Sequence, residues 1–157
     1  MPLSGLTVVL IDNGPNVRLR FEPGLQLALE ACLAARDAGA DPATRAWRIF
    51  AVTNRLIELH EIPENFGYLG QPTTQLAAAV NRVNILKPAR LAIFTGDYDR
   101  HVNLGEPRDG TRAYLWSENV QQLPPVRWQA LVCPAAAVVH EMIRAEAPDG
   151  AQEKPVR

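Results

Sequence analysis

Acidic side chains follow two apolar segments of this sequence, and their positions indicate metal chemistry. Residues 6–11 form an apolar run that ends at Asp12, and residues 91–95 lead across one glycine to Asp97 and Asp99. Ligands of open α/β sheets collect where parallel strands end, so we expect these acids to converge if the two strands are neighbours. Converging carboxylates repel one another, and a hard divalent cation such as Mg²⁺ is therefore their natural partner.

Two neutral residues extend this candidate site. Asn16 follows in the loop after Asp12, and Thr74 stands at the start of a helical segment. Both side chains would add neutral oxygen ligands at the same edge of the sheet. The alternative is that Asp12 and Asp97 only cap the turns that follow them, as aspartate commonly does.

The strands and helices that would position these residues follow from the hydrophobic pattern. The uninterrupted apolar runs 6–11 and 91–95 indicate strands that are buried on both faces. Helices are indicated where apolar residues recur at helical spacing, and the second has the stripe Leu76, Ala79, Val80 and Val83. The predicted helices cover 23–39, 74–87, 111–123 and 135–145; the other predicted strands are 47–53, its hairpin partner 55–62, and 128–133.

Strands that alternate with helices predict an α/β protein with a three-layer, Rossmann-like fold. The expected order is β-α-β-β-α-β-α-β-α, with a mostly parallel central sheet flanked by helices. The chain has 157 residues, of which 47% are hydrophobic and 21% charged, and this composition excludes a disordered chain. We expect residues 1–147 to form a single domain, and the charged, proline-bearing residues 148–157 to form a disordered tail.

The charge balance provides no general attraction to nucleic acid or to a membrane. Sixteen Lys and Arg oppose 17 Asp and Glu, so the formal net charge is −1. Cys32 and Cys133 are flanked by apolar residues, which predicts reduced, buried thiols. The sequence shows neither a secretory signal nor an apolar run of membrane-spanning length, so we expect a cytoplasmic protein.

Most of residues 5–145 resembles a von Willebrand factor type A (vWA) domain. That family opens with a buried strand and the loop motif D-x-S-x-S, which reads Asp12-Asn13-Gly14-Pro15-Asn16 here. A β-hairpin follows and is matched by residues 49–59. The family's T-N-L-x-x-A-L motif is matched in kind by residues 74–80, and its strand ending in T-D-G reads Thr95-Gly96-Asp97.

This resemblance implies a vWA-like fold and a metal-ion-dependent adhesion site at Asp12, Thr74 and Asp97, with Asn16 as a further ligand. In such a site the cation, Mg²⁺ or Mn²⁺, bridges to a carboxylate of another protein and does not act as a catalyst. The chain departs from the family pattern, because Gly14 has no hydroxyl, Asn16 replaces a serine, and the acid of the last motif stands one residue later. Each departure removes or displaces a hard oxygen, so a metal-free interaction module is the second form of this hypothesis.

Two of the same segments also resemble NYN-type nucleases of the PIN-like superfamily. The nuclease motif D-x-x-x-N is matched by Asp12 and Asn16, and the later motif [ST]-G-D-x-D is matched by residues 95–99. This resemblance implies that Asp12, Asn16, Asp97 and Asp99 hold Mg²⁺ and activate a water for cleavage of an RNA phosphodiester.

Two features of the sequence argue against the nuclease interpretation. Such nucleases need an acid just before or within the second helix, and residues 70–75 contain none. Their fold also needs a further helix and strand between residues 54 and 90. The near-neutral net charge gives no support for an RNA partner, so we expect another protein as the partner.

Overall fold

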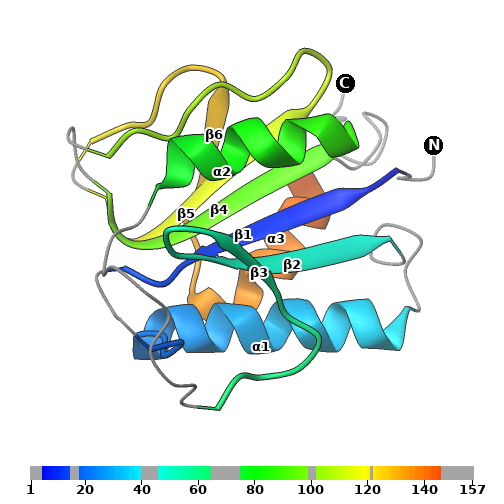
Figure 1. Cartoon of the computed structure of the whole chain (residues 1–157), viewed down its shortest axis with the longest axis vertical. Coiled ribbons are helices and arrows are strands. Elements are labelled where there is room, and N and C mark those ends of the chain that lie inside the picture. Colours follow the sequence, from blue (N-terminus) through cyan, green and yellow to red (C-terminus); the bar gives the residue numbers. More distant parts are fainter. Residues whose placement is uncertain are drawn as a thin grey trace, which may run out of the picture.

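The computed structural model of the chain describes residues 5–14, 18–39, 46–64, 75–98, 102–120 and 122–145 (Figure 1). These residues form one sheet with helices on both sides, so the predicted three-layer α/β architecture is confirmed. The strands are β1 (Thr7–Asp12), β2 (Trp47–Val52), β3 (Leu56–Glu58), β4 (Arg90–Tyr98), β5 (Arg112–Val120) and β6 (Trp128–Leu131). The helices are α1 (Pro23–Ala38), α2 (Leu76–Val83) and α3 (Val138–Ala145), with short 3₁₀ turns η2 (Asn84–Leu86) and η3 (Ala135–Ala137).

The six strands lie in the order β3-β2-β1-β4-β5-β6, which places β1 and β4 side by side at the centre. All neighbouring strands are parallel except β3, which returns antiparallel beside β2 through a tight hairpin. The apolar runs of β1 and β4 have fully buried side chains because helices cover both faces of the sheet. This neighbouring arrangement brings the ends of the two acid-bearing strands to one edge.

Alternate side chains of the strands enter two separate cores. On one face, Val9 and Ile11 of β1 pack with α1 and α3, whose buried residues include Leu29 and Met142. On the other face, β1 residues of the opposite parity pack against α2. Figure 1 shows α1 and α2 on opposite sides of the sheet. The helical stripe predicted for α2, consisting of Leu76, Ala79, Val80 and Val83, is buried as expected.

The predicted helix over residues 111–123 is wrong, because residues 112–120 form strand β5 in the centre of the second half of the sheet. Thr111 does not cap a helix; its hydroxyl donates to the carbonyl oxygen of Pro88 at 2.6 Å. The segment from Ala113 to Ser117 is buried at every position, which a strand covered on both faces accommodates. The observed order is therefore β-α-β-β-α-β-β-β-α.

Parallel strands β4, β5 and β6 follow one another without a helix in the described residues between them. Parallel neighbours usually need a crossover of a dozen or more residues, commonly a helix. The described parts of the two connections, residues 102–111 and 122–127, contain no helix or strand, and Leu104 of the first connection and Trp128 at the start of β6 join the core beside α2. Arg127 of the second connection donates to the carbonyl oxygens of Pro107 and Arg108 at 2.9 and 3.1 Å, which ties the two connections together.

Two further expectations meet the structure only in part. The strand partner predicted over 55–62 forms a ladder only at Leu56–Glu58, and Arg36 of α1 holds the chain beyond it by donating to the Leu59 and His60 carbonyls. Cys32 is buried, and burial raises the pKa of its thiol, but Cys133 is partly exposed.

Among the described residues, no helix is both long enough and apolar enough to cross a membrane.

Candidate functional site

Asp12 ends β1 at the carboxyl edge of the sheet, and both oxygens of its carboxylate accept hydrogen bonds. The backbone N–H of Gly14 donates to Oδ1 at 2.6 Å, and the hydroxyl of Thr95 on β4 donates to Oδ2 at 2.7 Å. Gly14 has a φ of +63°, in the left-handed region that glycine adopts without strain, and this turn brings its N–H back to the carboxylate. The side chain of Asp12 is thus oriented by the loop after β1 and by strand β4.

The partner of Asp12 across the sheet is Thr95 because of the register between β1 and β4. The last residue pair of the β1–β4 ladder joins Ile11 to Phe94, so Asp12 is level with Thr95. Strand β4 continues to Tyr98, beyond the end predicted from the sequence, and Asp97 pairs with Asn119 of β5. Two residues of strand correspond to roughly 6–7 Å, so the backbone of Asp97 lies that much farther along the sheet than the level of Asp12.

The other predicted site residues fall outside the described part of the chain. Asn16, Thr74 and Asp99 lie there, and of Asp97 only the backbone is described. The structure therefore brings together the two strands that carry the first and last motifs, and it places Thr95 against Asp12. The full ligand sets proposed for the adhesion site and for the nuclease stay predictions.

Asn13 and Thr53 shape the loops on either side of this edge, and both are almost completely buried. The amide of Asn13 donates to the carbonyl oxygen of Arg18 at 3.0 Å, and its Oδ1 accepts from the backbone N–H of Arg20 at 3.2 Å. These bonds hold Arg18 and Arg20 beside the end of β1. Thr53 shapes the β2–β3 hairpin in the same way, because its N–H and hydroxyl both donate to the Arg55 carbonyl.

Two acids that we did not predict lie against glycines near the first turn of α1. A Cβ on Gly96 of β4 would lie 2.6 Å from Oε1 of Glu22, and a Cβ on Gly24 of α1 would overlap the carboxylate of Glu118 on β5. Each glycine therefore leaves room for an acid of the other element, and both carboxylates lie near the positive end of the α1 dipole. A glycine inside an apolar strand can indicate such a close approach, and Gly96 was the available signal.

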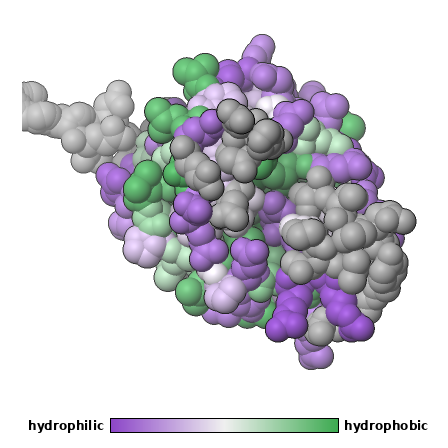
Figure 2. All heavy atoms as spheres, turned by 90° about the vertical axis from the view of Figure 1, so that its left-hand side faces the viewer, coloured by the Kyte–Doolittle hydropathy of each residue, from purple (hydrophilic) through white to green (hydrophobic). Residues whose placement is uncertain are grey.

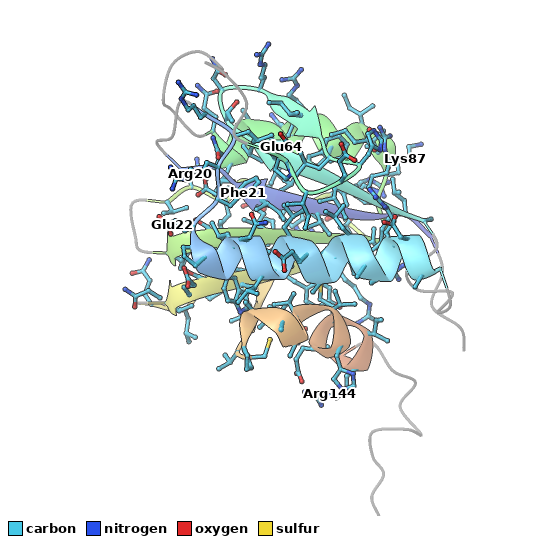
Figure 3. The ribbon with its side chains drawn as sticks, turned by 90° about the horizontal axis from the view of Figure 1, so that it is seen from below. Arg20, Phe21, Glu22, Glu64, Lys87 and Arg144 are labelled. Carbon is cyan, nitrogen blue, oxygen red and sulfur yellow. The ribbon has the colours of Figure 1, made fainter. Side chains whose placement is uncertain are left out.

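An open hollow of about 540 Å³ lies beside these residues, between the start of α1 and the chain that leaves β3. Its described lining includes Arg20, Phe21, Gln26 and Glu64. Figure 3 shows Arg20, Phe21 and Glu22 close together next to the first turn of α1. Figure 2 views this edge of the molecule directly and shows hydrophilic side chains spread around it.

Among the described residues, Asp12 would supply only part of the set of ligands that a cation needs. No group of three or more His, Cys, Asp or Glu among them could hold a metal ion. Asp12 itself retains binding capacity toward the described residues, because a carboxylate has about four acceptor positions and the described residues use two of them. The arrangement can therefore offer one oriented carboxylate to a cation or to a hydrogen-bond donor.

Comparison of the chain with family models, curated proteins and solved structures finds no match.

Proposed function

We propose that this protein is a non-catalytic interaction module of the vWA type that binds another protein at the carboxyl edge of its sheet. Asp12 is the centre of this binding edge, and Mg²⁺ or Mn²⁺ held there joins it to the partner. The observation that supports the proposal most is the orientation of Asp12 by Gly14 and Thr95 at the point where β1 and β4 meet. A carboxylate fixed before binding loses little side-chain entropy when a ligand arrives.

The arrangement of elements supports the same proposal. The vWA resemblance implies a strand, a helix, a hairpin, a second helix and a strand that carries the last motif. The described chain has β1, α1, the β2–β3 hairpin, α2 and β4 in that order. Between residues 54 and 90 the described elements are β3, α2 and η2, whereas the nuclease interpretation needs a further helix and strand there.

A bound cation would supply positive charge that attracts a carboxylate of the partner protein. Asp12 would bind it directly, and the proposal assigns further oxygens to Asn16, Thr74 and Asp97. Thr95 would act on Asp12 alone, by holding its carboxylate in one orientation. In the metal-free form of the proposal, Asp12 and its neighbours accept hydrogen bonds from donors of the partner instead.

Calorimetric titration with Mg²⁺ and with Mn²⁺ tests the metal part of the proposal. We expect a saturable heat for the unaltered protein and none for Asp12→Asn, which keeps the size of the side chain but removes its charge. Asp37→Asn is the matched control, because Asp37 is an exposed acid at the other end of α1 and should leave the isotherm unchanged. Absence of saturable heat in the unaltered protein would contradict the metal-bridged form and leave the metal-free form.

One observation favours the nuclease as a second candidate function. The hydrogen bond between Thr95 and Asp12 joins the two segments that match the nuclease motifs. Incubation of single-stranded RNA with the protein and Mn²⁺ separates the two candidates. Our proposal expects intact RNA after long incubation, whereas cleavage that disappears in both Asp12→Asn and Asp97→Asn would establish the nuclease.

A further inference from the structure

A small pocket lies between the β2–β3 hairpin and helix α2 (Figure 1). Its volume is about 40 Å³, which is room for roughly three water molecules. Pockets that hold a cofactor or a drug-sized molecule are much larger, at about 300–1,000 Å³. This pocket can therefore receive one small chemical group. Its polar lining consists of Thr53, Asn54 and Arg55 from the hairpin, Gln75 directly before α2, and Arg82 on α2.

Two cations and two amides of this lining offer hydrogen-bond donors. Arg55 and Arg82 are exposed, and their guanidinium groups are permanently charged. Within the described part of the chain, neither guanidinium has an ion pair or a hydrogen bond. Asn54 uses its side-chain oxygen, which accepts from the Thr53 hydroxyl at 3.2 Å, and its amide nitrogen remains a donor. The amide of Gln75 supplies further donors at the same pocket.

No acid among the described residues pairs with these two cations. The sequence contains neither Asp nor Glu from residue 65 to residue 96, a range that includes all of α2. Glu58 on the hairpin strand β3 is already bound through both oxygens by Arg48. A guanidinium binds a carboxylate or a phosphate through paired hydrogen bonds, so two arginines that line one pocket match an oxyanion.

The pocket lies one strand away from Asp12, on the same side of the sheet. Val52, which lines the pocket, is the residue of β2 that pairs with Asp12 of β1. Asp12 has the same parity along β1 as Leu10, whose side chain packs in the core on the α2 side. Neighbouring strands are about 4.8 Å apart, so one segment of a partner can contact both Asp12 and the pocket.

We propose that this pocket binds an acidic side chain of the protein partner, as a second anchor beside Asp12. Arg55 and Arg82 donate to the oxygens of the carboxylate, and the amides of Asn54 and Gln75 complete its set of donors. The inference rests on the proposed function, because the acid belongs to the protein that binds at the carboxyl edge. The pocket needs no cation at Asp12, since its own residues supply the donors.

The pocket favours a protein over a nucleic acid as the source of the oxyanion. Binding to a nucleic acid backbone depends on many phosphate contacts made by a series of Lys and Arg side chains. The pocket provides two arginines and room for a single group, and the net charge of −1 adds no general attraction for a polyanion. A single acidic side chain of a protein meets these conditions.

NMR titration of the full chain with a short polyglutamate peptide, at fixed ionic strength and with EDTA present, tests the pocket without any metal. We expect saturable shifts of the backbone amide signals of Asn54, Arg55 and Gln75. Arg55→Gln and Arg82→Gln should each raise the dissociation constant by about tenfold, the loss expected for one hydrogen-bonded charge. Both arginines are exposed, so the variants should fold, which a thermal melt verifies.

Lys87→Gln is the matched control for a general effect of charge. Lys87 is an exposed cation directly after η2, at the opposite edge of the sheet (Figure 3), and its replacement should leave the dissociation constant unchanged. Asp12→Asn should bind the peptide no less tightly, because this titration uses no cation. Failure of the metal titration would therefore leave the pocket standing, and failure of the peptide titration would leave the metal site standing.

A single-stranded polyuridylate of the same total charge distinguishes the two sources of an oxyanion. We expect the peptide to bind more tightly than this RNA. Tighter binding of the RNA, absence of saturable shifts with the peptide, or unchanged affinity in both arginine variants would overturn the proposal. A loss of affinity in Lys87→Gln equal to that in the arginine variants would do so as well.

Discussion

Asp12 accepts one hydrogen bond on each carboxylate oxygen, and each donor comes from a different part of the chain. Gly14 donates from the loop that follows β1, whereas Thr95 donates from β4, 83 positions away in the sequence. Thr95 is 2% exposed, so its hydroxyl has little access to water. The bond between Thr95 and Asp12 therefore matters to the orientation of the site and to the stability of the sheet edge.

Replacement of Thr95 by valine should lower the free energy of unfolding by about 1–2 kcal/mol, because it removes a hydrogen bond to a charged group while keeping the side-chain volume. Urea unfolding at neutral pH measures the change. Thr95→Ser retains the hydroxyl and should recover most of the loss attributable to the bond. Equal stability of the valine variant and the unaltered protein would show that the bond contributes nothing to folding.

A second residue pair should make stability depend on pH. Arg48 of β2 donates to both oxygens of Glu58 on β3 at 3.0 and 2.7 Å, and this hydrogen bonding lowers the pKa of Glu58 from its ordinary 4.5, with partial burial opposing the shift. Because the pKa is lower in the folded state, the stabilisation is present above about pH 4.5 and is lost as the pH falls through the lowered value.

Glu58→Gln should therefore be less stable than the unaltered protein at neutral pH, and the two should become equal in strongly acidic buffer. The side chains of Arg48 and Glu58 are 42% and 27% exposed, so solvent screening limits the expected difference to roughly 0.5–1 kcal/mol. Urea unfolding across the pH range measures it. Glu61→Gln, an exposed position nearby, serves as the control, and an identical pH dependence in both variants would contradict the assignment to this pair.

At the scale of the elements, the loop over residues 102–111 takes the place of a crossover helix beside α2. Asn84 of η2 donates to the Glu106 carbonyl at 3.0 Å, and Trp128 reaches the Gly105 carbonyl. Gly105 has a φ of +78°, and a Cβ there would lie 3.0 Å from the Cα of Ala77 on α2. The loop thus packs its backbone directly on the helix, which only glycine permits at this contact.

Gly105→Ala should destabilise the protein by about 2 kcal/mol or more, because left-handed backbone costs an alanine about 1–2 kcal/mol and the added methyl group meets the backbone of α2. Gly110→Ala is a matched control for the first contribution, since Gly110 has a φ of +89° with nothing within 4 Å of its Cβ position. Urea unfolding of both variants isolates the packing contribution as their difference. Equal losses would mean that α2 moves to accommodate the methyl group.

At the scale of the whole molecule, a net charge of −1 does not reveal that two edges of the sheet differ in their content of charged residues. The carboxyl edge of the sheet carries Asp12, Glu22 and Glu118, whereas the β6 edge has no charge from Trp128 to Val139. The proposed binding of a partner protein concerns the first of these two surfaces.

Local patterns in the sequence were sufficient to predict most of the strands and helices of the fold. The uninterrupted apolar runs of β1 and β4, the helical stripe of α2, and the hairpin after β2 each depend on residues close in sequence, so the α/β class and the adjacency of elements in the chain could be predicted. The short apolar run within residues 111–123 is compatible with either a helix or a strand, and only the strands on both sides of it in the sheet decide between them.

The sequence alone determined that acids follow two buried strands, because an apolar run and the acid after it consist of residues that are close together in the chain. Only the tertiary structure decided which groups meet: Thr95 with Asp12, Glu22 with Gly96, and Glu118 with Gly24. These contacts depend on the order and register of strands that are far apart in the chain. The position of β6 at the border of the described sheet has the same origin, since whether a strand lies at the centre or at the border of a sheet is set by its neighbours in space.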